Sequence, residues 1–210
     1  FSDATGGVTV LLSPDGQRGS AKGDGIGTDV LIGIEYVVGS DFDDLIVGTD
    51  RIYNEIFRGN AGNDTLRAGT GKALDGGFDQ VSYFDATGGV IVNLATGRAS
   101  GADGNDVLEG FEGVLASHFA DALTGNEADN YFQGYEGDDT IDGGAGRDLA
   151  SYELASAGMF VDLARGTSSG PDGTDVLISI ESVRGSTFGD TIVGSDADNV
   201  LNARAGDDSV

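Results

Sequence analysis

Over much of the chain, apolar residues recur every nine positions, each in the middle of a short extended segment. Segments such as DTL (64–66), DVL (106–108) and DTI (139–141) are too short for a helix and rich in β-branched residues. Glycine-rich turns separate them. The pattern predicts short strands whose central apolar residues point into a narrow core: Leu31, Ile46, Leu66, Leu108, Leu123, Phe132, Ile141, Leu177, Ile192 and Leu201.

Two turn-and-strand units of nine residues close one coil of eighteen, which indicates an all-β solenoid. Four contiguous nines fill residues 116–151, namely ASHFADALT, GNEADNYFQ, GYEGDDTID and GGAGRDLAS. Each begins with glycine or alanine and carries Asp or Asn at its sixth place. Stacking such coils would place a parallel sheet on each side of the core.

A longer repeat is superimposed on the nines. FSDATGGVTVLL (1–12), YFDATGGVIVNL (83–94) and YELASAGMFVDL (152–163) align without gaps. They divide the chain into three copies, 1–82, 83–151 and 152–210, the last incomplete, within one continuous domain. Residues 83–100 have the length of one coil, so we expect them to form a further coil without metal. Because the sequence starts at Phe1 without Met, we expect a piece of a longer protein.

Composition changes the picture in two ways. Thirty-seven glycines are too many for a helical domain, and the net charge of −25 disfavours nucleic-acid partners and anionic membranes. The acids recur at fixed places beside glycine, which points to cations. No cysteine and a single histidine exclude disulfides and make zinc unsuitable. No apolar run is long enough for a membrane span.

Calcium suits this arrangement because it takes six to eight oxygens from carboxylates and backbone carbonyls with tolerant geometry. A glycine-rich turn aims carbonyls inward and the sixth-place residue supplies a carboxylate or amide oxygen. The sequence therefore predicts several Ca²⁺ ions in the turns. The candidate ligands are Asp29, Asp44, Asp64, Asp79, Asp106, Asp121, Asp139, Asp148, Asp175, Asp190, Asp208, Asn54, Asn130 and Asn199.

Turns one coil apart should share an ion, because stacked strands lie about 4.8 Å apart. The expected pairs are Asp121 with Asp139, Asn130 with Asp148, Asp44 with Asp64, Asp190 with Asp208, and Asn54 with Asp79. The partners of Asp29, Asp106 and Asp175 stay open. Two roles stay open for Glu35, Glu112 and Glu181, which are calcium ligation and hydrogen bonding to the backbone. Phe1, Tyr83 and Tyr152 are expected to be core aromatics.

GNAGNDTLR (59–67), GADGNDVLE (101–109) and the adjacent nines of 134–151 resemble the glycine- and aspartate-rich nonapeptide of RTX, or hemolysin-type, calcium-binding proteins. The resemblance implies a right-handed parallel β-roll with Ca²⁺ between successive turns on the same edge, and type I secretion. The chain departs from the pattern where Phe42, Phe119 and Phe188 replace the fourth-place glycine.

These observations favour a non-catalytic, calcium-stabilised module of a secreted or cell-surface bacterial protein that folds on binding calcium outside the cell. It would serve as a spacer, adhesin stalk, surface layer or filament, and its open ends permit end-to-end or lateral self-association. The alternative is an accessory C-terminal roll of a secreted protease, lipase or epimerase. GTSSG (166–170) matches a nucleophile-elbow pattern but falls in a loop, so we expect no enzyme within the chain.

Overall fold

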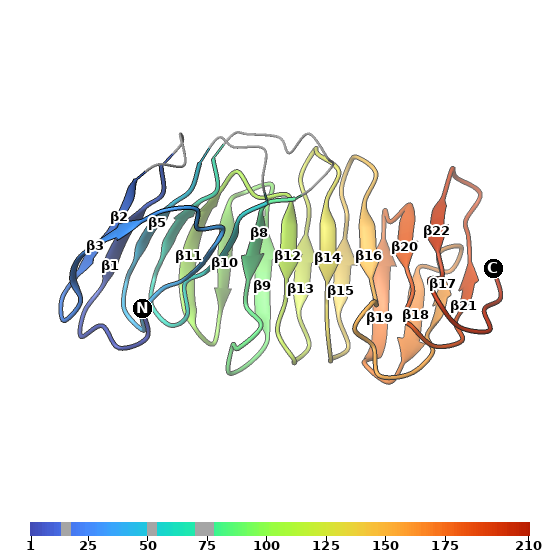
Figure 1. Cartoon of the computed structure of the whole chain (residues 1–210). Helices are drawn as coiled ribbons and strands as arrows, with labels where there is room; N and C mark the ends of the chain where they lie inside the picture. Colours follow the sequence, from blue (N-terminus) through green and yellow to red (C-terminus); the bar gives the residue numbers. More distant parts are fainter. Residues whose placement is uncertain (14–17, 50–53, 70–77) are drawn as a thin grey trace.

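The structure, a computed structural model, describes residues 1–13, 18–49, 54–69 and 78–210. Within these residues the chain forms 22 strands in two sheets and no helix. Figure 1 shows the strands stacked side by side along one axis, from the N-terminal strands at one end to the C-terminal strands at the other. No helix long and apolar enough to cross a membrane occurs in this part of the chain.

One sheet has fourteen strands and is called the larger sheet here. In spatial order its strands are β21 (Thr191–Val193), β17 (Phe160–Asp162), β18 (Thr167–Gly170), β19 (Gly173–Ile178), β15 (Thr140–Asp142), β13 (Ala122–Thr124), β9 (Val90–Asn93), β10 (Arg98–Gly101), β11 (Gly104–Glu109), β7 (Thr65–Arg67), β5 (Leu45–Val47), β1 (Val8–Leu11), β2 (Gly19–Gly23) and β3 (Gly27–Leu31).

The smaller sheet has eight strands, one for each coil. In spatial order they are β22 (Val200–Asn202), β20 (Ser182–Arg184), β16 (Leu149–Ser151), β14 (Tyr131–Gln133), β12 (Gly113–Leu115), β8 (Gln80–Ser82), β6 (Ile56–Arg58) and β4 (Tyr36–Val38). The chain alternates between the sheets, and neighbouring coils pair in parallel, as where Leu123 lies opposite Ile141 and Phe132 opposite Ala150. The predicted all-β parallel roll is confirmed.

The core lies between the sheets and consists mainly of the apolar residues at the eighth places. Eight of the ten predicted core residues are buried, whereas Leu31 and Leu201, near the two ends of the stack, are only partly buried. The smaller sheet adds Phe57, which is fully buried and packs edge-to-face on Phe111 with ring centroids 6.0 Å apart. Phe57 does not follow from the nine-residue spacing, because two additional residues shift its turn out of phase.

Residues 83–100 do not form a coil of their own, which corrects the expectation above. After β9 the chain turns back within the larger sheet, and β9, β10 and β11 form an antiparallel meander in which Ala99 lies between Val92 and Asp106. A tight turn makes this reversal: Asn93 Oδ1 accepts a hydrogen bond from the Thr96 N–H (2.8 Å), and Gly97 has a φ of 63°. Glycine adopts that left-handed backbone without strain.

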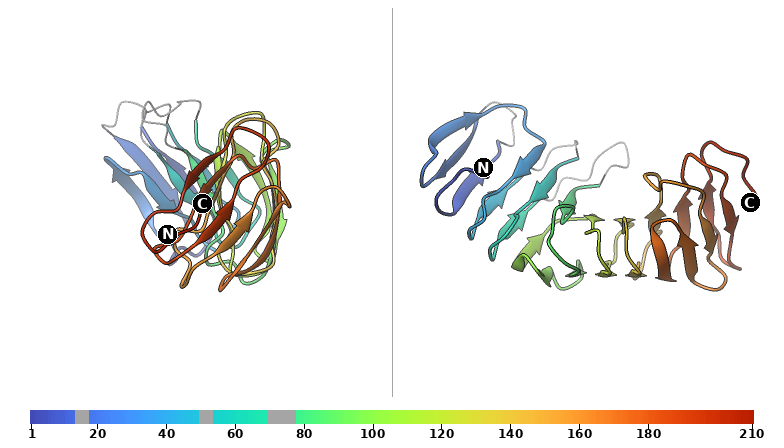
Figure 2. Two further views of the ribbon diagram at one scale, coloured as in Figure 1. Left: turned by 90° about the vertical axis from the view of Figure 1, so that its right-hand side faces the viewer. Right: turned by 90° about the horizontal axis from the view of Figure 1, so that it is seen from below.

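The same meander recurs at β1–β3 and β17–β19, although β17 is shorter. Each such coil places three strands in the larger sheet and one in the smaller sheet. Since neighbouring strands are about 4.8 Å apart, a coil of this kind is thicker on the side of the larger sheet than on the side of the smaller sheet. The stack is correspondingly curved in the right-hand view of Figure 2, while the left-hand view looks along it.

Candidate metal centres in the turns

The turns that lead into the larger sheet make up the first edge of the roll, and their carboxylates form a hydrogen-bonded ladder. The backbone N–H of Asp121 donates to Oδ1 of Asp139 (2.9 Å), and that of Asp139 donates to Oδ1 of Asp175 (3.1 Å). Equivalent bonds of 2.9 Å join Asp44 to Asp64, Asp64 to Asp106, and Asp190 to Asp208. Three expected pairs are therefore adjacent, and Asp106 and Asp175 gain the partners that the sequence left open.

The turns that lead into the smaller sheet make up the second edge, which carries a ladder of the same kind. The Asn130 N–H donates to Oδ1 of Asp148 (2.8 Å), as the expected pairing requires. The Asp148 N–H then donates to Oε2 of Glu181 (3.0 Å), and the Asp79 N–H donates to Oε2 of Glu112 (3.3 Å). Of the two roles left open for these glutamates, the structure shows the backbone hydrogen bond, and it aligns their carboxylates with the ladder.

The pairing of Asn54 with Asp79 needs a correction. Glu55 is the residue directly before β6: it is buried, and its N–H donates to Oδ1 of Asp79 (2.8 Å), whereas Asn54 is exposed. The turn that starts at Gly48 is two residues longer than a nine, so the nine-residue count does not apply to it, and the predicted Asn54 lies one residue before the ladder position. Residues 50–53 of this turn lie outside the described part of the chain.

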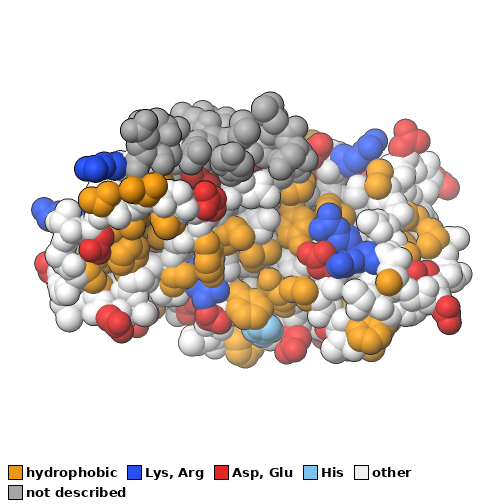
Figure 3. All heavy atoms as spheres, in the orientation of Figure 1, with side chains coloured by type: hydrophobic (Ala, Val, Ile, Leu, Met, Phe, Trp, Pro, Cys, Tyr) orange, Lys and Arg blue, Asp and Glu red, His pale blue; other side chains and the backbone are white. Residues whose placement is uncertain are grey.

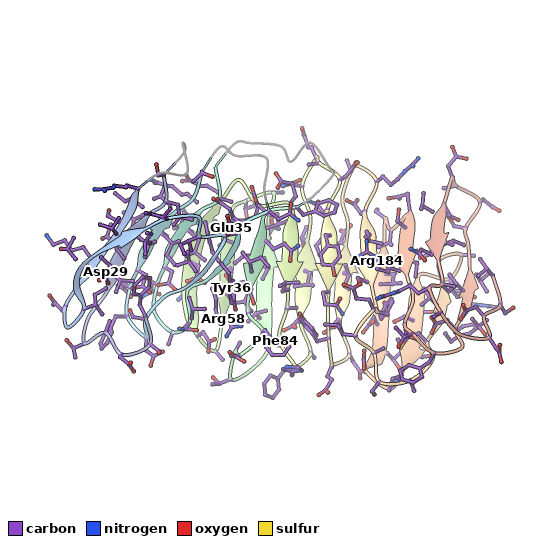
Figure 4. All side chains as sticks on the ribbon, in the orientation of Figure 1. Asp29, Glu35, Tyr36, Arg58, Phe84 and Arg184 are labelled. Atoms are coloured by element: carbon purple, nitrogen blue, oxygen red, sulfur yellow. The ribbon has the colours of Figure 1, made fainter. Side chains whose placement is uncertain are left out.

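Asp29 and Asn199 lie near opposite ends of the stack. Asp29 is exposed on β3, the terminal strand of the larger sheet, and Figure 4 shows it at the N-terminal end of the stack. Asn199 stands on the second edge, where its Oδ1 accepts the Ser195 N–H (2.7 Å) and its amide nitrogen donates to the carbonyl of Glu181 (3.4 Å). Neither position brings two carboxylates together.

Three ladder carboxylates bury an oxygen that has no hydrogen-bond donor among the described residues. They are Asp64, Asp139 and Asp148, which are at most 1% exposed, and in each the orphaned atom is Oδ2. A buried carboxylate oxygen without a partner is costly because it has lost its water. Each of these oxygens therefore needs a proton or a cation.

Burial also shifts the acidity of these groups. The pKa of Asp64 and of Asp139 is raised from 3.8 to about 8; loss of water is the largest cause, neighbouring carboxylates add to it, and a backbone N–H acts in the opposite direction. The pKa of Asp148 rises to about 7 for the same reasons, with Glu181 the largest contribution among the neighbouring charges. Desolvation and Glu112 likewise raise the pKa of Asp79 to about 7. A bound cation would reverse these shifts, because it favours the ionised carboxylate.

Glycine at the first place of the turn lets the orphaned oxygen approach the backbone closely. A Cβ built on Gly134 would overlap Oδ2 of Asp139, and one built on Gly143 would overlap both Oδ2 of Asp148 and the carbonyl oxygen of Ser179. That carbonyl and the carboxylate therefore both lie on the same side of Gly143. Ser179 has a left-handed conformation with a φ of 51°. One carboxylate and one carbonyl are both hard oxygens of the type that calcium prefers.

No three His, Cys, Asp or Glu side chains converge on one point within the residues that the structure describes. An ion on either edge must therefore take part of its shell from backbone carbonyls. The turn supplies these, and calcium tolerates such irregular shells, whereas Mg²⁺ demands near-octahedral geometry and Zn²⁺ favours nitrogen and sulfur ligands. The residues present thus fit calcium.

The comparison with protein families agrees with this chemistry. A model of the RTX calcium-binding nonapeptide repeat matches residues 51–72, 119–150 and 183–210. The chain carries RTX calcium-binding nonapeptide repeats. Its repeats bind several Ca²⁺ ions, and the RTX match includes the turns of Asp64, Asp139 and Asp148 but none of the three meanders. No curated protein matches the chain.

Two sets of side chains at the RTX ladders were not anticipated. The hydroxyl of Tyr83 donates to Oδ2 of Asp106 (2.8 Å), and that of Tyr152 donates to Oδ2 of Asp175 (3.0 Å). Both tyrosines are buried core aromatics as expected, but their hydroxyls also donate to the carboxylates of Asp106 and Asp175, each of which ends one run of three aspartates on the first edge. The other set consists of serines at the second place of certain turns. Comparing second-place residues across all turns would have revealed them.

Proposed function

We propose that this RTX chain is a calcium-stabilised, non-catalytic β-roll module of a secreted or cell-surface bacterial protein, and that it folds when it meets calcium outside the cell. Extracellular calcium modules have affinities of the order of 10⁻⁴–10⁻³ M, which suits the calcium concentration outside cells. Ligands that must be ionised to bind metal couple binding to folding. Carboxylates of the ladders on both edges, foremost those with an orphaned oxygen, are the proposed ligands.

The observation that carries this proposal is the set of orphaned oxygens of Asp64, Asp139 and Asp148. Near neutral pH and without a cation, each of these buried carboxylates must take up a proton that the unfolded chain would release, or remain charged and unpaired, and either requirement costs free energy when the coils stack. Like charges along the ladders add repulsion. A narrow core offers little to offset these costs. Calcium removes both of them at once, which makes it a condition for folding rather than an accessory.

A structural role for the parent protein is supported by the elongated stack of coils in Figure 1 and its open ends. Val30, beside the terminal strand edge, is 60% exposed. Figure 3 shows one face of the molecule, on which apolar side chains lie among acidic and basic ones. An end with an unpaired strand and exposed apolar side chains favour end-to-end or lateral association in a spacer, stalk, surface layer or filament. Electron microscopy of the native material separates a filament from a monomeric tail.

Far-ultraviolet circular dichroism of the chain in EGTA and then in millimolar calcium tests the proposal. We expect little β-structure in EGTA and a cooperative gain of β-signal on adding calcium. Magnesium at the same concentration is the control for ionic strength and should leave the spectrum close to that in EGTA. A chain that is equally rich in β-structure in all three solutions would contradict calcium-coupled folding.

A further inference from the structure

Two kinds of RTX-type turn occur among the residues that the structure describes, and they differ in the backbone of their second residue. In the first kind, called left-handed turns here, the second residue has a φ between 66° and 89°. These residues are Asn60, Tyr135, Gly144 and Arg204, and the fourth-place glycines two positions later have φ values of 127° to 142°.

In the second kind, called stapled turns here, the second residue donates its backbone N–H to the side chain at the ladder position. The donors are Ser40, Thr49, Ser117, Asn126, Ser186 and Ser195, and the acceptors are Asp44, Glu55, Asp121, Asn130, Asp190 and Asn199. None of these six donors has a positive φ.

In the stapled turn of Asp121, both carboxylate oxygens accept hydrogen bonds from the protein. Its Oδ2 accepts the Ser117 N–H (2.8 Å), while its Oδ1 accepts the Ser117 hydroxyl (2.7 Å) and the Val90 N–H of the preceding coil (2.7 Å). The same hydroxyl accepts the N–H of Phe119 (3.1 Å). Equivalent bonds surround Asp44 and Asp190. Hydrogen-bond donors of the protein thus satisfy the carboxylate oxygens that an ion would otherwise contact.

The left-handed turn of Asp139 presents the opposite situation. Its Oδ1 accepts the Asp121 N–H, but its Oδ2 has no donor among the described residues although the side chain is 1% exposed. Asp64 and Asp148, which stand in the other two left-handed turns with fully buried carboxylates, share this orphaned oxygen. Each of the three thus has a buried carboxylate oxygen without a partner, packed closely against the first-place glycine of its turn.

Asparagine at the ladder position occurs in only one of the two classes of described turns. Asn130 and Asn199 occupy this place in two of the stapled turns, where an amide oxygen accepts the second-place N–H as well as a carboxylate does. The four left-handed turns carry only aspartate: Asp64, Asp139, Asp148 and Asp208. An amide satisfies a hydrogen-bond donor but supplies no charge to a cation. Among the described turns of these two kinds, charge is therefore retained wherever the staple is missing.

We propose that the second residue of each turn decides whether that turn takes a calcium ion: a left-handed turn binds one, and a stapled turn is closed without metal. This inference rests on the proposed calcium-dependent function and makes it more specific. In the ladder of Asp121, Asp139 and Asp175, a serine closes the first carboxylate and a tyrosine closes the last, which leaves the middle one for the ion. Asp44, Asp64 and Asp106 repeat this order.

Native mass spectrometry of the chain in calcium counts the bound ions directly. We expect Asp139→Asn to carry one calcium fewer than the unaltered chain and Asp121→Asn, which copies the natural Asn130 turn, to carry the same number. Loss of an ion in both variants would overturn the inference, because the two turns would then be equivalent sites. An unaltered chain that binds no calcium would instead contradict the proposed function itself.

A gain-of-site variant gives an independent answer that does not depend on weakening any turn. Ser117→Gly combined with Phe119→Gly removes the staple and places glycine at the second and fourth positions, as in the left-handed turn of Gly144 and Gly146. We expect this double variant to bind one calcium more than the unaltered chain. A count that stays unchanged in the double variant would overturn the inference.

Discussion

The hydroxyl of Tyr152 offers a sharp test of how the ladder is stabilised in this RTX chain. Tyr152→Phe removes one donor from Oδ2 of Asp175, and the O···O distance of 3.0 Å is that of a normal hydrogen bond in a buried setting. A hydrogen bond to a charged group contributes about 1.5–3 kcal/mol. Ser168 still donates to the same oxygen at 2.6 Å. We therefore expect a loss near the lower limit, about 1.5–2 kcal/mol.

Urea unfolding in saturating calcium measures this loss as a lower midpoint with an unchanged slope. Tyr36→Phe is the matched control, because Tyr36 is 48% exposed, and it should change the free energy of unfolding by less than about 0.5 kcal/mol. A double-mutant cycle with Asp175→Asn should give a coupling energy of at least about 1 kcal/mol. Equal costs for the two tyrosine variants, or no coupling, would refute the reasoning.

Three further predictions follow from the same geometry. Gly134→Ala should abolish binding of the ion beside Asp139, because the added Cβ overlaps Oδ2 of Asp139. Calcium titration calorimetry should then show one binding site fewer. The control Gly88→Ala, whose Cβ meets only a side-chain Cβ at 3.2 Å, should retain all sites. Phe132→Ala, at a fully buried position, should lower the free energy of unfolding in saturating calcium by about 3–5 kcal/mol, as measured by urea unfolding. A loss below about 1 kcal/mol would contradict the placement of Phe132 in the core. The pKa of Asp64 and Asp139 is raised from 3.8 to about 8 in the fold, so the calcium-free fold holds protons that the unfolded chain releases. The circular-dichroism signal of β-structure in EGTA should therefore fall as the pH rises from about 4 to about 8. A signal that rises over this range would contradict the prediction.

The regular part of the roll could be predicted from the sequence because nine-residue spacing couples each turn to one inward apolar residue. Leu123, Phe132 and Ile141 follow one another at this spacing, and all three are buried. The adjacency of Asp121 and Asp139 follows from the same count, since two nines make one coil. Periodicity is informative here because every coil repeats the same geometry.

The remaining features depend on contacts that no periodicity reveals. The segment 83–100 has the length of a coil, yet the tight turn at Gly97 reverses the chain within one sheet. The ladder position is Glu55 and not Asn54 because the turn that starts at Gly48 has two additional residues, and a count of nine-residue units cannot place such an insertion. The bond from Tyr83 to Asp106 joins residues 23 positions apart, and only stacking brings them together.

Whether the left-handed turns bind calcium and the stapled turns do not can be seen in a crystal structure of the chain grown in calcium, with data collected at a wavelength where calcium scatters anomalously. We predict anomalous peaks about 2.3–2.6 Å from Oδ2 of Asp64, Asp139 and Asp148. The stapled turns of Asp44, Asp121 and Asp190 should show no peak within that distance. Peaks of equal height at both kinds of turn, or no peak beside Asp139, would contradict the account.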